Sequence, residues 1–146
     1  MANLIPHNLT IKNNTNSDIH GLENILNNFY PYAQKRLGFN KPVSLNCISD
    51  LKNAEDPLGR TAYYDPNKME ITLYIDKRHV KDLLRSFSHE LVHHKQNCEG
   101  CFDNLEGEMG EGYAQKNDHM RKMEEEAYLE GNLALRDWED GQKGDN

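Results

Sequence analysis

SHELVHH, residues 88–94, is the stretch of sequence on which the expected fold depends. Residues four apart on an α-helix lie on the same face, so His89 and His93 can bind one metal ion while Glu90 lies beside it. Apolar residues recur at helical spacing before and within this stretch, at Val80, Leu83, Leu84, Phe87 and Leu91. At about 100° per residue, both histidines fall opposite the apolar stripe. The pattern predicts a helix with one face in the core and two imidazoles facing a cleft. The alternative is that both histidines are ordinary surface residues.

The composition is typical of one small globular domain. The chain has 146 residues, of which 28% are charged and 36% hydrophobic, and this length suffices for one core. The formal net charge of -7 argues against nucleic-acid binding, because no excess of basic residues would neutralise phosphates. No apolar run approaches the roughly 20 residues that span a bilayer, so no membrane association is expected. We expect a single domain over 1–146, with flexible ends at 1–15 and 139–146.

The first residues and the cysteines indicate the compartment. Residues 1–15 are polar and rich in asparagine, unlike a signal peptide. Three cysteines, an odd number, are not typical of a disulfide framework. A cytoplasmic protein is therefore expected, with Cys98 and Cys101 as reduced thiols in a loop. Their alternatives are a second zinc site, which would need two more ligands, and a redox pair.

Two further helices are expected on either side of the histidine helix in the sequence. The first is capped by Ser17 or Asp18, is kinked or divided at Pro31, and ends at Gly38. The second is expected over about 113–138, where apolar residues again recur at helical spacing.

Three segments rich in β-forming residues predict strands, at 43–48, 61–64 and 69–75. Residues 65–68 join the last two strands as a hairpin, and 8–11 form either a short first strand or a tail. Asp76 is a candidate cap for the histidine helix. The expected fold is an α+β domain with a small mixed or antiparallel sheet packed on the three helices.

The third ligand of a catalytic zinc site must come from elsewhere in the chain, since such sites have three protein ligands and one position for water. The last predicted helix offers three consecutive acids, Glu124, Glu125 and Glu126. Counted from Met120, Glu124 falls about 40° from the centre of the apolar stripe, whereas the other two fall on the solvent side. A carboxylate among core residues is costly unless it is paired or binds a metal. Glu124 is therefore the predicted ligand, with an ion pair to Arg85 or a lysine as the alternative.

These motifs resemble those of the zincin metallopeptidases, in particular the gluzincins. In that family H-E-x-x-H is followed, on a later helix, by E-x-x-A-[DN] or E-x-x-x-D. HELVH at residues 89–93 matches the first part and EEEA at 124–127 the second, while Tyr128 stands where the family has an acid or amide. The resemblance covers about residues 61–138 and is to small stand-alone peptidases of bacterial and phage genomes.

The resemblance implies a zinc-dependent peptidase of the minimal zincin-like fold. One Zn²⁺ would be held by His89, His93 and Glu124, and Glu90 would act as general base toward the zinc-bound water. A peptide or protein substrate would lie as an added strand beside the edge strand 69–75.

Several assignments stay open in the sequence. His119 is the leading candidate for an oxyanion donor, and the other candidates are Tyr128, Tyr113, His94 and Arg85. His94 lies on the core side of its helix, which favours a structural role.

Glu99 is a rival third ligand, because metzincins carry theirs six residues after the second histidine. Against it, Gln96 replaces the glycine of that motif. The glycine- and acid-rich segment 98–112 is either a lid or an inert connection. The function also has alternatives, namely a non-catalytic, zinc-stabilised protein-binding module or a zinc hydrolase acting on a non-peptide amide.

Overall fold

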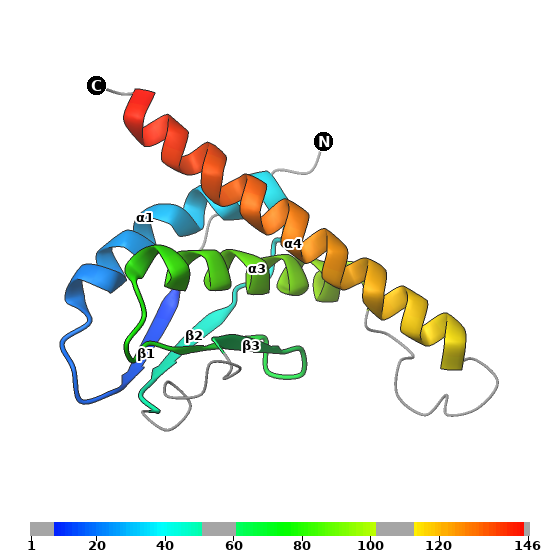
Figure 1. Cartoon of the computed structure of the whole chain (residues 1–146), viewed down its shortest axis with the longest axis horizontal. Coiled ribbons are helices and arrows are strands. Elements are labelled where there is room, and N and C mark those ends of the chain that lie inside the picture. Colours follow the sequence, from blue (N-terminus) through cyan, green and yellow to red (C-terminus); the bar gives the residue numbers. More distant parts are fainter. Residues whose placement is uncertain (1–7, 51–60, 102–112, 145–146) are drawn as a thin grey trace.

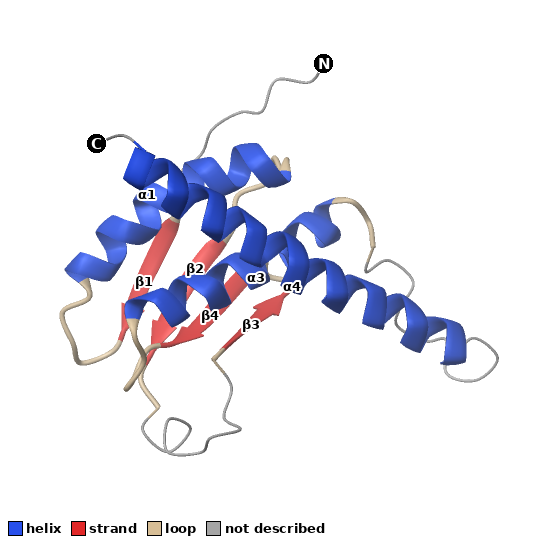
Figure 2. Cartoon of the chain, turned by 45° about the horizontal axis from the view of Figure 1, so that its top comes forward, coloured by secondary structure: helices blue, strands red, loops and turns tan. Residues whose placement is uncertain are grey.

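The fold consists of a four-stranded mixed sheet with three helices on one face (Figures 1 and 2), as seen in a computed structural model that describes residues 8–50, 61–101 and 113–144. The helices are α1 (His20–Leu37), α3 (Val80–Cys98) and α4 (Tyr113–Gly144). The strands are β1 (Thr10–Asn14), β2 (Ser44–Ile48), β3 (Ala62–Asp65) and β4 (Glu70–Tyr74). The predicted α+β class is confirmed.

The strands lie in the order β1-β2-β4-β3, so β1 and β3 form the two edges of the sheet. β1, β2 and β4 are parallel, and β3 is antiparallel to β4. The predicted hairpin is confirmed, and its turn is held by Asp65, whose Oδ1 accepts hydrogen bonds from the backbone N–H groups of Asn67 and Lys68. The prediction that 69–75 forms the edge is wrong. β4 has neighbours on both sides and its central residues are buried, and β3 is the edge strand next to it.

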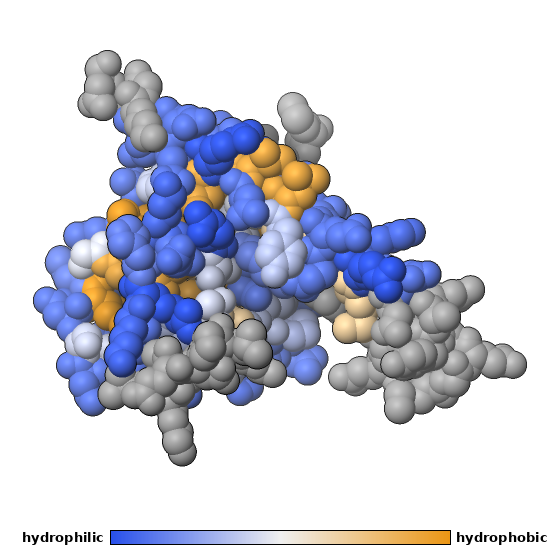
Figure 3. All heavy atoms as spheres, viewed as in Figure 1, coloured by the Kyte–Doolittle hydropathy of each residue, from blue (hydrophilic) through white to orange (hydrophobic). Residues whose placement is uncertain are grey.

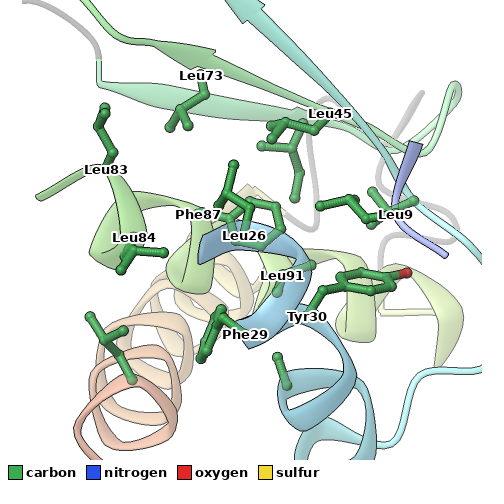
Figure 4. Close-up of a cluster of buried hydrophobic side chains, with 14 of the residues drawn as sticks. Leu9, Leu26, Phe29, Tyr30, Leu45, Leu73, Leu83, Leu84, Phe87 and Leu91 are labelled. Atoms are coloured by element: carbon green, nitrogen blue, oxygen red, sulfur yellow. The ribbon is translucent and has the colours of Figure 1, made fainter. Parts of the chain in front are cut away.

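The core lies between the sheet and the helices. Figure 4 shows Phe87 and Leu91 of α3 facing Leu45 and Leu73 of the sheet, and all four are fully buried. Phe29 of α1 makes edge-to-face contacts with Phe87 and, on α4, with Trp138. Truncation of one such buried aromatic ring typically costs about 3–5 kcal/mol of unfolding free energy. Because the apolar stripe of α3 packs in the core, His89 and His93 on the opposite face of the helix point away from the core.

The ends of α1 differ in part from the prediction. The helix begins at His20, after Ser17 and Asp18. Its N-cap residue is Ile19, which makes no capping hydrogen bond through its side chain. Asp18 still contributes, because its Oδ1 accepts a hydrogen bond from the His20 N–H. Pro31 does not divide the helix, which continues to Leu37. Gly38 ends it as predicted, in a left-handed conformation with φ of 85°.

The cap and the length of α3 also differ. His79, not Asp76, caps the helix, and its Nδ1 accepts a hydrogen bond from the Lys81 N–H. The helix starts at Val80, four residues after Asp76. Lys77, which lies between them, has a left-handed backbone conformation with φ of 55°. At the other end α3 includes Cys98, so this thiol does not lie in a loop.

The two ends of the chain are only partly described. α4 continues to Gly144, so residues 139–144, expected as part of a flexible end, lie in this helix. At the other end, β1 lies within residues 1–15, which were also expected to form a flexible end. The proposed lid falls largely on residues 102–112, which lie outside the described residues. None of the helices in the described part of the chain is long and apolar enough to cross a membrane, and the face in Figure 3 is mostly hydrophilic.

Candidate metal centre

Three side chains from two helices converge beside the edge strand. Nε2 of His89 lies 2.6 Å from Oε1 of Glu124, and Nε2 of His93 lies 3.1 Å from Oε2 of the same carboxylate. The potential ligand atoms of the three residues all lie within 4.8 Å of one another. Among the residues that the structure describes, no other group of three or more histidine, cysteine or acidic side chains converges in this way.

The donor set fits a zinc ion. Two imidazole nitrogens and one carboxylate oxygen are the ligands of many catalytic zinc sites. Ligand atoms about 2 Å from a tetrahedral ion lie roughly 3.3 Å from one another. The His93–Glu124 contact of 3.1 Å is close to that separation, whereas the His89–Glu124 contact of 2.6 Å is that of a direct hydrogen bond. Burial, with the nearby His93 as a second cause, lowers the pKa of His89. A lowered pKa favours the neutral imidazole, which is the form that binds metals.

Glu124, predicted as the third metal ligand, lies against the two histidines, but its expected burial is wrong. Its side chain is 51% exposed, because it lies at the border of the apolar face of α4 and not within it. Met123 and Ala127 occupy the buried positions beside it. The alternative ion pair with Arg85 is not formed, since Arg85 pairs with Asp82.

A close crossing of α3 and α4 brings the glutamate to the histidines. A Cβ atom added to Gly131 would lie only 3.0 Å from the His89 Cα, which shows how closely the two backbones approach. At the same point, the buried Ser88 hydroxyl donates a hydrogen bond of 2.7 Å to the Gly131 carbonyl. Glu124 lies about two helical turns before this crossing, where its carboxylate reaches both imidazoles.

Gln96 is the functional residue that sequence reasoning missed. It is 1% exposed, and its Nε2 donates hydrogen bonds of 2.9 Å to the Met123 carbonyl and to Oε1 of Glu126. Because these two acceptors fix the amide, its Oε1 faces Nδ1 of His93 at 2.8 Å and must accept the proton of that nitrogen. In the neutral imidazole, Nε2 of His93 then keeps the lone pair that a metal needs. The available signal was its position three residues after His93, on the same helical face.

Glu90 is buried beside the cluster and is only 8% exposed. Its Oε2 has no hydrogen-bond partner among the described residues. Burial raises the pKa of this carboxyl to about 7, with a smaller contribution from the charge of Glu124. A carboxyl with a pKa near neutrality can accept and return a proton under physiological conditions.

Two hollows meet at the cluster, and Glu90 and Glu124 line both of them. The larger one, of about 400 Å³, is also lined by Thr61, Ala62, Arg85, Ser86, His89, Tyr128 and Asn132. The smaller one, of about 260 Å³, is also lined by Tyr63, Tyr64, Pro66 and His93. β3 therefore borders both hollows.

The candidate oxyanion donors lie in different places. The Tyr128 ring makes an edge-to-face contact with His89 at 4.6 Å and lines the larger hollow. His119 is not brought to the cluster, because its Nε2 lies 2.8 Å from the Cys101 carbonyl and it lines neither hollow. Arg85 lines the larger hollow. Tyr113 is the first residue of α4, and its side chain lies outside the described part.

The rival ligand and the structural histidine also have clear positions. Glu99 follows the last turn of α3 and pairs with Lys95, so it does not join the cluster. His94 is fully buried, as its place on the core side of the helix predicted. Its Nε2 lies 2.7 Å from the Lys41 carbonyl, and its Nδ1 lies 2.7 Å from the Tyr64 hydroxyl. None of the three cysteines forms a disulfide.

Comparison of the chain with models of known protein families, with curated proteins and with solved structures gives no match. These comparisons therefore indicate no function for the site.

Proposed function

We propose that this protein is a zinc-dependent metallopeptidase whose ion is held by His89, His93 and Glu124. The observation that carries the proposal is the convergence of both imidazoles on one carboxylate beside a buried glutamate, Glu90, that has an unbonded oxygen. The gluzincin-like motifs of the sequence predict the same four residues in the same roles.

The ligand set favours a hydrolase over a zinc-stabilised binding module. Structural zinc sites usually fill all four positions with cysteine and histidine, whereas catalytic sites use three protein ligands. The cluster provides three ligands, and the thiols of Cys98 and Cys101 are not part of it. A purely structural site would also have no use for the buried carboxyl of Glu90, which is costly to keep.

Each residue of the site would have its own role in peptide hydrolysis. A bound zinc ion would lower the pKa of a coordinated water to about 7 and polarise the scissile carbonyl. Glu90 would accept a proton from the attacking water and pass it to the leaving amine nitrogen. Tyr128, which contacts His89, is the oxyanion donor that the geometry favours over His119.

The substrate would bind along β3. This strand has one neighbour among the described strands, β4, and a peptide would pair with its other edge as an added strand. Its residues border both hollows, so a peptide paired with it would cross the cluster. A peptide therefore fits the site better than a compact non-peptide amide. A cytoplasmic location also belongs to the proposal, supported by three cysteines that form no disulfide.

The direct test uses the full chain reconstituted with one equivalent of Zn²⁺ and unfolded casein as substrate. We expect hydrolysis that a chelator abolishes and zinc restores. Glu90→Gln should retain the zinc while the rate falls by about 100-fold or more. Glu125→Gln, an exposed acid on α4, is the matched control and should cleave at the parental rate. Parental activity of Glu90→Gln would contradict the mechanism, and zinc binding without any hydrolysis would favour the binding module.

A further inference from the structure

Two hollows of different chemistry open onto one cluster. Because Glu90 and Glu124 line both hollows, a substrate bond held at these residues has one hollow on each side. Thr61 and Ala62 border the larger hollow, and Tyr63 and Tyr64 border the smaller one. A strand advances about 3.3 Å per residue, so a peptide paired with β3 passes from one hollow to the other within a few residues.

The larger hollow is rich in hydrogen-bond donors. Besides His89, five of its side chains can donate a hydrogen bond, namely Thr61, Arg85, Ser86, Tyr128 and Asn132. Among the described residues that line it, Arg85 is the one that carries a permanent positive charge. The other charged groups there, Glu90 and Glu124, belong to the proposed catalytic machinery.

The guanidinium of Arg85 retains donors for a ligand. Its Nη1 donates to Oδ1 of Asp82 at 3.0 Å, and both side chains are at least half exposed. Exposed pairs of this kind are weak, and a guanidinium has five N–H groups in all. The remaining N–H groups of Arg85, together with the neutral donors, therefore provide a binding environment suited to a carboxylate.

The smaller hollow has an aromatic side formed by Tyr63 and Tyr64, with Pro66 beside them, in addition to Glu90, His93 and Glu124 of the cluster. The hydroxyl of Tyr64 is already used, because Asn97 donates to it at 3.0 Å and it lies 2.7 Å from Nδ1 of His94. Its ring is thus an apolar surface with a satisfied polar end. Such a wall suits an aromatic or large apolar side chain.

We infer that the protein cleaves peptides with an acidic side chain on one side of the scissile bond and an aromatic or large apolar side chain on the other. The inference rests on the proposed function and adds its substrate class. Arg85 is the residue that selects the acidic side chain, and Tyr63 contributes to selection of the apolar one.

The first experiment maps cleavage sites in a mixed peptide library with the zinc-loaded full chain and mass spectrometry. We expect Asp or Glu to be enriched on one side of the cleaved bonds and Phe, Tyr or Leu on the other. In peptides that differ only at the acidic position, Glu should exceed Lys in kcat/KM by roughly three- to tenfold at low salt. The difference should shrink in 0.5 M NaCl, since salt screens exposed charges.

The second experiment exchanges the charge. Arg85→Glu should abolish or reverse the preference for Glu over Lys, and Tyr63→Ser should reduce the preference for the aromatic residue without changing the charge preference. Lys35→Glu, the same change of charge on α1, which borders neither hollow, is the matched control and should keep the parental preferences. Binding of the same peptides to zinc-loaded Glu90→Gln, measured by fluorescence anisotropy, should follow the same order.

The outcomes separate the inference from the proposed function. Cleavage of peptides without a charge preference, or with one that Arg85→Glu leaves unchanged, overturns the inference while the peptidase assignment stands. Failure to cleave any peptide overturns the peptidase assignment and the inference with it.

Discussion

Oε1 of Gln96 lies 2.8 Å from Nδ1 of His93, and the same amide is bonded to the helix that carries Glu124. One buried side chain therefore orients a potential metal ligand and holds α4 against α3. Hydrogen bonds of this kind set the tautomer and ring orientation of zinc-bound histidines.

Gln96→Leu should lower zinc affinity by about 10- to 100-fold, because His93 loses its acceptor. The measurement is competition with a fluorescent zinc chelator. Ser88→Ala is the matched control, since it also removes a hydrogen bond from α3 to a carbonyl of α4 but leaves the acceptor of His93 in place. Gln96→Glu retains an acceptor for His93 and should fall between Gln96→Leu and the parent. Equal affinities of the Gln96→Leu and Ser88→Ala variants would refute this role.

Gly131→Ala should destabilise the protein by about 1–3 kcal/mol, since the new methyl group would meet the backbone of α3 at His89. The shift of α4 should also weaken zinc binding by moving Glu124. Gly141→Ala, on the same helix, is the control. A Cβ there meets nothing within 4 Å, and alanine should stabilise the helix by about 0.5–1 kcal/mol. Urea unfolding of the two metal-free variants measures both changes, and equal effects would contradict the close crossing.

The metal-free protein should lose stability as the pH rises from 5 to 8. Burial raises the pKa of Glu90 from 4.5 to about 7, so over this range the folded state binds more protons than the unfolded state. Its contribution is therefore fully present below the unfolded pKa and is lost as the pH rises through the folded value.

Glu90→Gln should remove most of this loss, which is on the order of 2–3 kcal/mol. Urea unfolding in the presence of a chelator, at pH 5 and at pH 8, provides the comparison. A parental protein as stable at pH 8 as the variant would show that Glu90 is not buried as described.

Tyr64→Phe should destabilise the protein by about 1–3 kcal/mol, because buried His94 loses its hydroxyl partner. The β3–β4 hairpin should loosen beside the cluster, which lowers peptide hydrolysis. Zinc affinity should change little, since the described hydrogen-bond partners of this hydroxyl, His94 and Asn97, are not among the proposed ligands. Tyr63→Phe, in the same strand, serves as control. A marked loss of zinc in Tyr64→Phe would contradict the role of the Tyr64 hydroxyl as a partner of His94 and not of the metal ligands.

The features that the sequence predicted well are local ones. The histidine helix follows from the apolar spacing between Val80 and Leu91, and the hairpin follows from a turn between two β-rich segments. Glu124 was identified from its helical angle, although the reasoning placed it too deep in the core. An angle of about 40° leaves a long side chain at the border of a buried stripe, where it reaches out of the core.

The features that could not be predicted depend on segments far apart in the chain. The edge position of β3 is set by the pairing of β4 with β2, which no local pattern encodes. The role of Gln96 appears only once α4 brings Met123 and Glu126 against it. The prediction of the α3 cap was wrong for a different reason. A ring nitrogen of His79 accepts the hydrogen bond that the acid Asp76 was expected to accept.

The most direct test of the central claim is a crystal structure of the zinc-loaded full chain with anomalous diffraction recorded at the zinc absorption edge. We expect one strong peak about 2 Å from Nε2 of His89, Nε2 of His93 and a carboxylate oxygen of Glu124. A peak at another group of side chains, or a zinc ion bound to the two histidines with Glu124 turned into solvent, would contradict the account.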